Sequence, residues 1–467
     1  MRIHKGQRRS GAMRRRAVAV AIVLAATGGS LTLTPQAAVA APNYSGDPVH
    51  YWNDVLLQLM RGRGGAPGPL ARSAAMLNGA IYDAESSYRL RWHKMTSEPY
   101  IAASHYTAWI EGPGEEERVI GRTAYNILLG LFPEQTAYLD NKFMERFGTK
   151  PTDFDLLDTT VVNKMVTQMR DARKADGSDD QRVYTADGVP GAWRPTSYAD
   201  MPDPKCDEAS EAATPNWGLV KPFAIPSGST FRPPTPQLYG TYDKLLASTE
   251  YKKQVDEVRR LGAVNSTERT NEQTAIAWFW ANDLDGTYKP PGQLLQHTRE
   301  VATARGLTTY QNARLFALVS LAMADASIAE WDVKYQTPID LWRPVSAIRD
   351  GGLDTSWKPL SANRSNVNFT PCFPAWASGH AAFAGAWAGV MKRYFGSDNI
   401  SFSLTTEDPH ATVKTRSYTS FSQAAKENAD SRVYLGVHYP WDATDGLGLG
   451  EDIAEHVVTN KLKPIPS

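Results

Sequence analysis

Three short clusters of polar residues in the C-terminal part of the chain have the residue types and spacing of an anion-binding site. In chain order the clusters are Lys334 with Arg343-Pro344, then Ser378-Gly379-His380, then Ser431-Arg432 with His438 and Asp442. They supply three fixed cations, two imidazoles and several backbone N–H donors. Such a set suits a tetrahedral or trigonal-bipyramidal oxyanion, with one histidine able to touch its central atom.

The second cluster is predicted to lie at the N-terminus of a helix. Pro371 and Pro374 stop any helix upstream, and the small residues after His380 restart one. Backbone N–H groups at a helix N-terminus are free and favour an anion. Ser378 adds a hydroxyl donor, Gly379 lets the backbone approach a ligand closely, and His380 is a candidate acid–base group. The alternative is an ordinary N-cap serine followed by a solvent-exposed histidine.

The third cluster combines a cation, a histidine and a carboxylate around the start of another predicted helix. Arg432 falls in the last turns of one helix, and Pro440 suits the first turn of the next. Asp442 follows His438 by four residues, so its carboxylate can accept the Nδ1 proton and turn Nε2 inward as a nucleophile or metal ligand. A surface His–Asp pair at a helix start is the alternative.

The first cluster consists of two cations near the end of a long apolar helix. Lys334 ends that helix, and Arg343 lies in a turn that Pro344 closes. A guanidinium binds oxyanion oxygens as a bidentate fork, whereas an ammonium acts as a mobile point charge. Taken alone, these residues are more typical of ordinary cations at a helix C-terminus. Only the occurrence of all three clusters together favours a binding pocket.

Helical periodicity of apolar residues predicts the elements that must position these clusters. The predicted helices cover 71–88, 118–131, 154–169, 242–261, 270–282, 292–304, 312–334, 381–394, 420–435 and 441–458. A stretch at about 183–236, rich in Pro, Gly, Ser and Asp, predicts a long connecting loop. The predicted fold class is all-α, with two helical bundles joined by a Pro-rich connection. The expected parts are an N-terminal lobe at 41–182, the connection at 183–240, and a C-terminal bundle carrying the oxyanion site at 241–467.

Residues 1–40 have the composition of a cleaved export signal. They hold seven Lys and Arg and no acidic residue, then a short apolar run and a small-residue site at Ala38-Val39-Ala40. The run is too short to span a bilayer, so we expect secretion, by a Sec or a twin-arginine route, and no transmembrane segment in the mature chain. A disordered basic tail is the alternative. Without this segment, 43 Lys and Arg stand against 50 Asp and Glu, a net charge of about −7 that disfavours nucleic-acid binding.

The chain has two cysteines, Cys206 and Cys372, and both lie in the predicted mature part. An exported protein can form a disulfide between them, but the sequence does not show whether they meet. Because Cys372 lies eight residues before His380, a bridge would tether the candidate site. The sequence also leaves the oligomeric state open.

The three clusters resemble the signature of the superfamily that unites vanadium-dependent haloperoxidases, type-2 phosphatidate phosphatases and bacterial class A acid phosphatases. Its pattern is Lys-x6-Arg-Pro, then Pro-Ser-Gly-His, then Ser-Arg-x5-His-x3-Asp. The third block is complete here, and Ala377 replaces the proline of the second. In the first block eight residues instead of six separate Lys334 from Arg343, which we interpret as an insertion near Thr337.

The resemblance implies a role for each residue. It implies that His438 Nε2 is the apical vanadium ligand of a peroxidase, or the nucleophile that forms a phosphohistidine in a phosphatase. His380 would be the acid–base group, and Asp442 would orient His438. The residues expected to hold the oxygens of vanadate or phosphate are Lys334, Arg343, Ser378, Gly379 and Arg432. Asp283, in a Trp-rich segment similar to the family's, would be a carboxylate partner of Arg432.

The haloperoxidase branch, and its chloroperoxidases in particular, is favoured by the length of the N-terminal lobe and by Phe373. This residue occupies a place where chloroperoxidases carry Phe and bromoperoxidases tend to carry His, although simple packing is the alternative. The implied activity is oxidation of a halide by hydrogen peroxide at vanadate, followed by halogenation of an organic acceptor. A phosphomonoesterase, and a non-catalytic helical protein with a relic anion pocket, remain alternatives.

Overall fold

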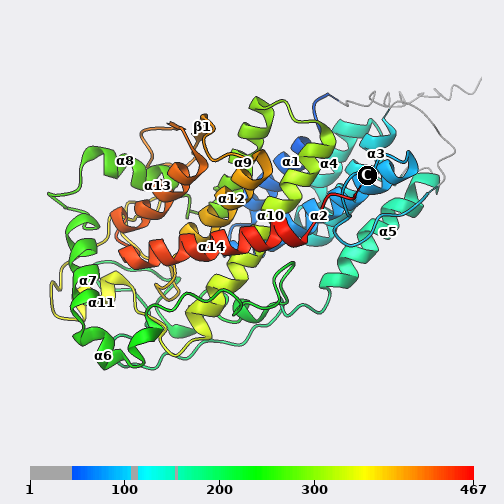
Figure 1. Ribbon diagram of the computed structural model, residues 1–467. Helices are drawn as coiled ribbons and strands as arrows, with labels where there is room; N and C mark the ends of the chain where they lie inside the picture. Colours follow the sequence, from blue (N-terminus) through cyan, green and yellow to red (C-terminus); the bar gives the residue numbers. More distant parts are fainter. Residues whose placement is uncertain (1–44, 107–113, 153–155, 467) are drawn as a thin grey trace, which may run out of the picture. The chain divides into compact units, whose positions relative to one another are not determined.

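Helices account for nearly all of the regular structure, as the apolar periodicity predicts (Figure 1). The computed structural model describes residues 45–106, 114–152 and 156–466, which belong to the unit formed by residues 40–467. The α-helices are α1 (Pro48–Arg63), α2 (Pro67–Arg91), α3 (Glu115–Leu131), α4 (Thr136–Phe147), α5 (Leu156–Arg173), α6 (Tyr242–Ala247), α7 (Thr249–Leu261), α8 (Asn271–Trp280), α9 (Lys289–Ala304), α10 (Thr309–Tyr335), α11 (Pro344–Arg349), α12 (Gly379–Phe395), α13 (Phe421–Tyr434) and α14 (Pro440–Asn460). The shorter elements are the 3-10 turns η1 (Pro133–Gln135), η2 (Ala209–Glu211), η3 (Trp217–Leu219) and η4 (Gln237–Tyr239), and the antiparallel strands β1 (Phe402–Thr405) and β2 (Thr415–Tyr418).

Two of the sequence-based expectations fall outside the described residues. The predicted export signal at 1–40 lies there, and so does residue 154, the expected start of one helix. The rest of that helix is present as α5.

Helices α12 and α14, which begin in the second and third clusters, pack with their backbones in direct contact (Figure 1). Glycines make this possible. A Cβ at Gly385 of α12 would overlap the carbonyl oxygen of Leu447, and one at Gly450 of α14 would overlap that of Ala382. Glycine weakens an isolated helix, but here it removes the steric barrier to close approach. The packing fixes the starts of the two helices relative to each other.

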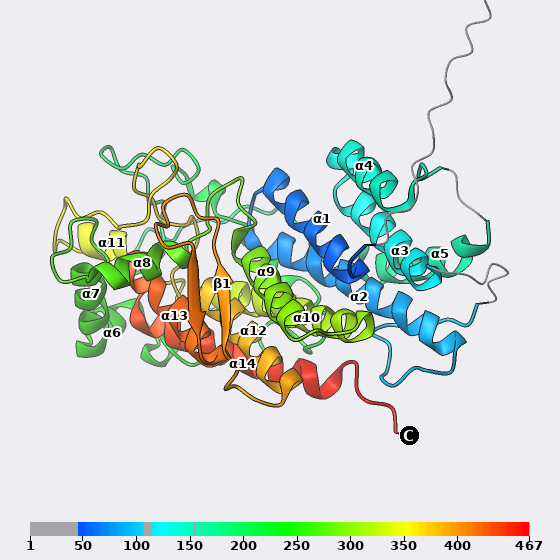
Figure 2. The same ribbon diagram turned by 90° about the horizontal axis from the view of Figure 1, so that it is seen from above.

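Among the described helices, α10 is the longest and takes part in both bundles. It packs against α2 from the N-terminal half and against α12 and α14 from the C-terminal half (Figure 1, Figure 2). By length and composition α10 could cross a membrane, but 94% of its most apolar stretch is buried inside the protein, which is typical of a core helix. Its last turn carries Lys334, so the core itself positions the first cluster.

Two helical bundles therefore share α10. In the first bundle, α1 to α5 pack with α9 and α10. In the second bundle, α10 packs with α12 and α14, and α7, α8 and α13 complete it (Figure 2). The connection from α5 to α6 contains only the turns η2 to η4. Asp325 of α10 anchors it, because this buried carboxylate accepts three consecutive backbone N–H groups, those of residues 223–225, at 2.6 to 2.9 Å. The all-α fold with two bundles is thus confirmed, while the exact lobe boundaries stay a prediction.

The local structure differs from the periodicity in several places. Residues 136–147 form α4, which the periodicity does not predict because few of its residues are buried. Residues 242–261 form two helices instead of one, since Ser248 leaves the helical conformation and caps α7 by accepting the Tyr251 N–H. The β1–β2 ribbon has strands too short for a period to show. Pro344 begins α11 instead of closing a turn.

Candidate active site

The second cluster lies at the start of α12, where the sequence places it. Ser378 is the N-cap, and its Oγ accepts the Ala381 N–H at 3.4 Å. The N–H of Ser378 donates to the carbonyl oxygen of Asp442 at 3.0 Å, which joins the starts of α12 and α14. Gly379 is the first helical residue, and backbone N–H groups of a first turn have no acceptor within the helix. This segment therefore offers donors to an anion.

His438 lies between α13 and α14 with both ring nitrogens in hydrogen bonds. Nδ1 is 3.0 Å from Oδ2 of Asp442, and Nε2 is 3.1 Å from Nη1 of Arg343. A neutral imidazole satisfies a carboxylate and a guanidinium together only when Nδ1 carries the proton and Nε2 accepts. Burial, reinforced by the positive charge of Arg343, lowers the pKa of His438 well below its usual value and keeps the ring neutral. The Nε2 lone pair therefore faces the cations.

Arg343 is buried beside this imidazole and is only partly satisfied by protein acceptors. Its Nε donates to the Phe373 carbonyl and its Nη1 to the Val437 carbonyl, both at 2.7 Å. Its Nη2 has no hydrogen-bond partner among the described residues. Burial lowers the pKa of Arg343 to about 10, so the guanidinium is still charged at neutral pH. A buried donor without an acceptor costs roughly 1–3 kcal/mol, which a bound anion would relieve.

Lys334 reaches the same region from α10 in spite of the longer spacing to Arg343. Its Nζ donates to three carbonyl oxygens within residues 374–377, at 2.5 to 3.1 Å, and pairs with Glu330 Oε1 at 2.9 Å. An ammonium has three N–H donors, so these protein acceptors use them all. Burial lowers the pKa of Lys334 to about 8. In this structure Lys334 therefore holds the segment in front of Ser378 in place.

Arg432 and His380 both face Asp283, which follows α8. Arg432 Nη2 donates to Asp283 Oδ2 at 2.7 Å, and His380 Nε2 lies 3.8 Å from Oδ1. His380 Nε2 is also 2.9 Å from the Ala281 carbonyl oxygen, so this nitrogen carries the proton and Nδ1 is the acceptor. Burial and the charge of Arg432 lower the pKa of His380 to about 4. The ring is therefore neutral at neutral pH, and Nδ1 is its acceptor nitrogen.

The unpaired donors around His438 test whether the site fits an oxyanion. Arg343 Nη2 and the Nε and Nη1 atoms of Arg432 are buried and have no hydrogen-bond partner in the described part of the chain. Several oxygens around one central atom can accept such donors at once. Within residues 45–106, 114–152 and 156–466 there is no group of His, Cys, Asp and Glu able to hold a bare metal ion. The donors therefore fit vanadate or phosphate, held mainly by its oxygens.

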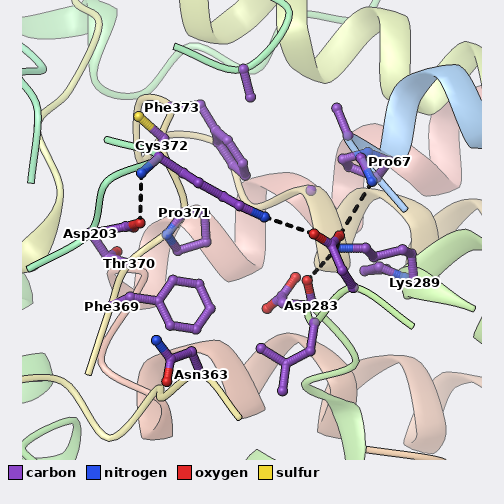
Figure 3. A pocket seen from close by; sticks show the side chains of 18 of the residues that line it. Pro67, Asp203, Asp283, Lys289, Asn363, Phe369, Thr370, Pro371, Cys372 and Phe373 are labelled. Atoms are coloured by element: carbon purple, nitrogen blue, oxygen red, sulfur yellow. Dashed lines mark hydrogen bonds and ion pairs between the residues drawn. The ribbon is translucent and has the colours of Figure 1, made fainter. Parts of the chain in front are cut away.

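A cavity of about 580 Å³ opens beside these residues (Figure 3). Gly379, His380, Arg432 and His438 line it together with Phe373. The Phe373 ring centroid lies 4.5 Å from Arg343 Cζ and 5.0 Å from the ring centroid of Trp331. Phe373 thus forms an apolar part of the wall directly next to a cation.

A disulfide joins the connection to the site. The sequence does not decide whether Cys206 and Cys372 are paired. In the structure they form a disulfide between positions 166 residues apart. Cys372 lines the cavity next to Phe373 (Figure 3). Asp203 and Lys205, from the connection, line it as well. The connection is therefore part of the cavity wall, although it contributes none of the three clusters.

Glu330 belongs to the site but is not among the residues that the sequence singles out. It lies one turn before Lys334 on α10 and is fully buried. A Cβ added to Gly379 would be 2.9 Å from Glu330 Oε2, so this carboxylate packs against the start of α12. In the sequence Glu330 only interrupts an apolar helix. Its four-residue spacing to Lys334 is the signal that predicts an ion pair.

Comparison with known proteins by sequence points to one family. The model of the VCPO second helical-bundle domain matches residues 314–465, which contain all three clusters. The vanadium chloroperoxidase of Curvularia inaequalis is 34% identical over 234 residues, which cover 39% of this chain and 38% of that protein. The match therefore spans well under half of this relative's length.

Comparison by structure extends the likeness to most of the chain. The first bacterial vanadium-dependent iodoperoxidase has a TM-score of 0.70 at 24% identity, covering 92% of this chain and 100% of that one. A holo-type bacterial vanadium-dependent chloroperoxidase has a TM-score of 0.63 at 18% identity, covering 88% and 92%. At these identities the likeness shows the fold alone. The sequence matches and the shared fold thus lead to the same group of proteins: residues 314–465 match the VCPO second helical-bundle domain, and most of the chain has the fold of the vanadium-dependent haloperoxidases.

Proposed function

We propose that the protein is an exported, vanadate-dependent haloperoxidase that oxidises a halide with hydrogen peroxide. The observation that carries this proposal is the state of His438: Asp442 holds the proton on Nδ1, and the Nε2 lone pair faces Arg343. This is the form of imidazole that binds a metal centre through Nε2. The names of the relatives, a vanadium chloroperoxidase and bacterial vanadium-dependent iodo- and chloroperoxidases, support vanadate as the cofactor.

The residues around His438 have distinct tasks in this proposal. His438 Nε2 would hold the vanadium atom, and the unpaired donors of Arg343 and Arg432 would bind its oxygens. The first-turn backbone at Ser378 and Gly379 would add further N–H donors. When bound, vanadate supplies a Lewis-acid centre that activates peroxide toward the halide.

His380 would accept the proton that the incoming peroxide loses. Its ring is neutral, its Nε2–H is held by the Ala281 carbonyl, and its Nδ1 is therefore the atom that accepts a proton. The cavity beside Phe373 would admit the halide and an organic acceptor. In the overall reaction hydrogen peroxide and the halide, with one proton, give hypohalous acid and water.

Export is supported by two independent observations. Residues 1–40 have the composition of a signal peptide. Cys206 and Cys372 form a disulfide, and such bonds persist mainly in oxidising compartments. N-terminal sequencing of the protein recovered from the culture medium tests this part. A mature N-terminus just after Ala40 is expected, and a cell-associated protein that begins at Met1 contradicts export.

A reconstitution assay tests the activity. Purified protein supplied with orthovanadate, hydrogen peroxide and bromide should halogenate a cyclic diketone, and His438→Ala should abolish the reaction. His456→Ala, on α14 outside the site, is the matched control and should keep the activity. If no vanadate-dependent halogenation occurs anywhere between about pH 4 and pH 8, where histidines titrate, the proposal is wrong.

A phosphomonoesterase is the second candidate, because the same free Nε2 lone pair could attack phosphorus. Steady turnover of an aryl phosphate that vanadate inhibits would support it, as would a phosphohistidine at position 438 in the quenched reaction. Vanadate binding with neither activity would instead favour a relic anion pocket.

A further inference from the structure

Three cations surround His438, and three carboxylates lie against these cations or against His438 itself. The cations are Lys334, Arg343 and Arg432, and the carboxylates are Glu330, Asp283 and Asp442. Glu330 lies 2.9 Å from Lys334, and Asp283 lies 2.7 Å from Arg432. Asp442 is the carboxylate that most favours the charged form of Arg343. Burial raises the pKa of Glu330 and that of Asp442 to about 7, so the fixed charges of the pocket balance only above neutral pH, where all six groups are ionised.

Glu330 differs from the other two carboxylates of this set. Asp442 orients His438, and Asp283 holds Arg432. Glu330 has its ion pair with Lys334, but neither of its oxygens accepts a well-formed hydrogen bond from the described residues. Its side chain is 0% exposed, so solvent does not screen its charge. Its carboxylate packs behind Gly379, which belongs to the anion-binding segment.

Glu330 is the strongest influence that keeps Lys334 charged, but other acceptors also hold the ammonium in place. Three carbonyl oxygens of residues 374–377 already accept from Nζ. What Glu330 adds is a buried carboxylate behind Gly379, negatively charged above its pKa of about 7. A buried carboxylate repels a doubly charged anion nearby more strongly than a singly charged one, and low-dielectric surroundings enlarge the difference.

We propose that Glu330 sets the anion selectivity of the site, so that it favours a singly charged, protonated oxyanion over a doubly charged one of the same shape. The inference rests on the proposed function in one respect, namely that the resident oxyanion is vanadate. At neutral pH vanadate is mainly a dihydrogen monoanion, whereas molybdate is a tetrahedral dianion without a proton. These two anions therefore separate charge and protonation from shape.

Binding of both anions at about pH 7.5, above the pKa of Glu330, is measured by titration calorimetry and tests the proposal. The wild-type protein should bind vanadate about tenfold or more tightly than molybdate. Glu330→Gln keeps the side-chain shape and a carbonyl acceptor for Lys334 but removes the charge. Its molybdate affinity should rise by about tenfold, with a much smaller change for vanadate, so that the preference shrinks or disappears. Glu330→Met, a second variant of similar volume, should shift the preference in the same direction.

Asp332→Asn is the control, because Asp332 lies on the same helix but pairs with Arg232 away from the cavity. An unchanged vanadate-to-molybdate ratio in Glu330→Gln overturns the proposal, and so does an equal shift in the control. A parallel loss of both affinities also overturns it, because that result assigns Glu330 a purely supporting role for Lys334. Wild-type protein that binds no vanadate contradicts the proposed function itself. Thermal melting curves of each variant show that the folded protein is being compared.

Discussion

Nη1 of Arg343 lies 3.1 Å from Nε2 of His438, the atom that would hold vanadium. The guanidinium thus occupies the lone pair of the ring while Asp442 holds the proton on the opposite nitrogen. An oxyanion bound at Nε2 must take over this hydrogen bond. The unpaired Nη2 of Arg343 belongs to the same planar guanidinium, so it can donate a hydrogen bond to an anion oxygen while the side chain stays in place.

The tautomer of His438 gives the first prediction. In Asp442→Asn an amide NH₂ can donate to Nδ1, which moves the ring proton to Nε2 and blocks the lone pair. We expect vanadate affinity to fall by about 10- to 100-fold, as for other groups that orient a metal ligand. Calorimetry measures the affinity, and ¹⁵N NMR of the imidazole reports the proton position. Asp445→Asn is the control: Asp445 lies on the same helix as Asp442 but accepts a hydrogen bond from Trp376 Nε1. This variant should leave the vanadate affinity within about twofold of wild type.

The shape of Arg432 gives the second prediction. Arg432→Lys keeps the charge but removes the fork whose Nε and Nη1 are unpaired, and it weakens the contact with Asp283. Vanadate affinity should drop by roughly tenfold or more, since a hydrogen bond to a charged group is worth about 1.5–3 kcal/mol. Arg349→Lys, at the end of α11 and paired with Asp200, is the control. Equal affinities for Arg432→Lys and wild type would show that Arg432 does not bind the anion.

The apolar wall next to Arg343 gives the third prediction. Phe373→His places a polar, hydrated ring beside the guanidinium and weakens the positive field that the site applies to a bound anion. Chloride is the harder halide to oxidise, so the ratio of chloride to bromide kcat/KM should fall by about tenfold. Phe369→His, in the same cavity but without a ring contact to Arg343, is the control. The same ratio in both variants would mean that Phe373 only packs.

The burial of His380 gives the fourth prediction, which concerns stability. The pKa of this ring is about 4 in the folded protein and about 6.5 when unfolded, so the unfolded chain binds more protons between these values. Its contribution to the free energy of unfolding is therefore present above pH 6.5 and is lost as pH falls toward 4, by at most about 3 kcal/mol. Because buried carboxylates have the opposite pH slope, the measurement is the difference between wild type and His380→Gln in urea at several pH values. Parallel curves would contradict the prediction.

The disulfide gives the fifth prediction. Opening the Cys206–Cys372 bond releases a long loop of the unfolded chain and detaches the connection from the cavity wall. The free energy of unfolding should fall by roughly 2–5 kcal/mol on reduction. The Cys206→Ser/Cys372→Ser double variant should match the reduced protein, and added reductant should not change it further. If reduction leaves the melting temperature of the wild type unaltered, the bond does not stabilise the fold.

The sequence by itself determined the parts of the site that depend on local spacing. Proline and small residues around Ser378 place a helix start there, and the four-residue offset between His438 and Asp442 makes their contact across one turn. The helices themselves follow from apolar periodicity, because each must bury one face. Helix α4 is not predicted because few of its residues are buried, and the β1–β2 ribbon is not predicted because its strands are too short to show a period.

Only the tertiary structure decided which distant groups meet. Asp283 and Arg432 are 149 residues apart, and Cys206 and Cys372 are 166 apart, so no local pattern fixes either contact. The resemblance gives Arg432 a carboxylate partner, Asp283, but no carboxylate partner is predicted for Lys334 or Arg343. The fold brings the buried Glu330 to Lys334 and places the charge of Asp442 near Arg343, and it turns Lys334 toward backbone carbonyls. Net charge in a pocket is a sum over all neighbours in space, and the packing of α10 against α12 and α14 sets that sum.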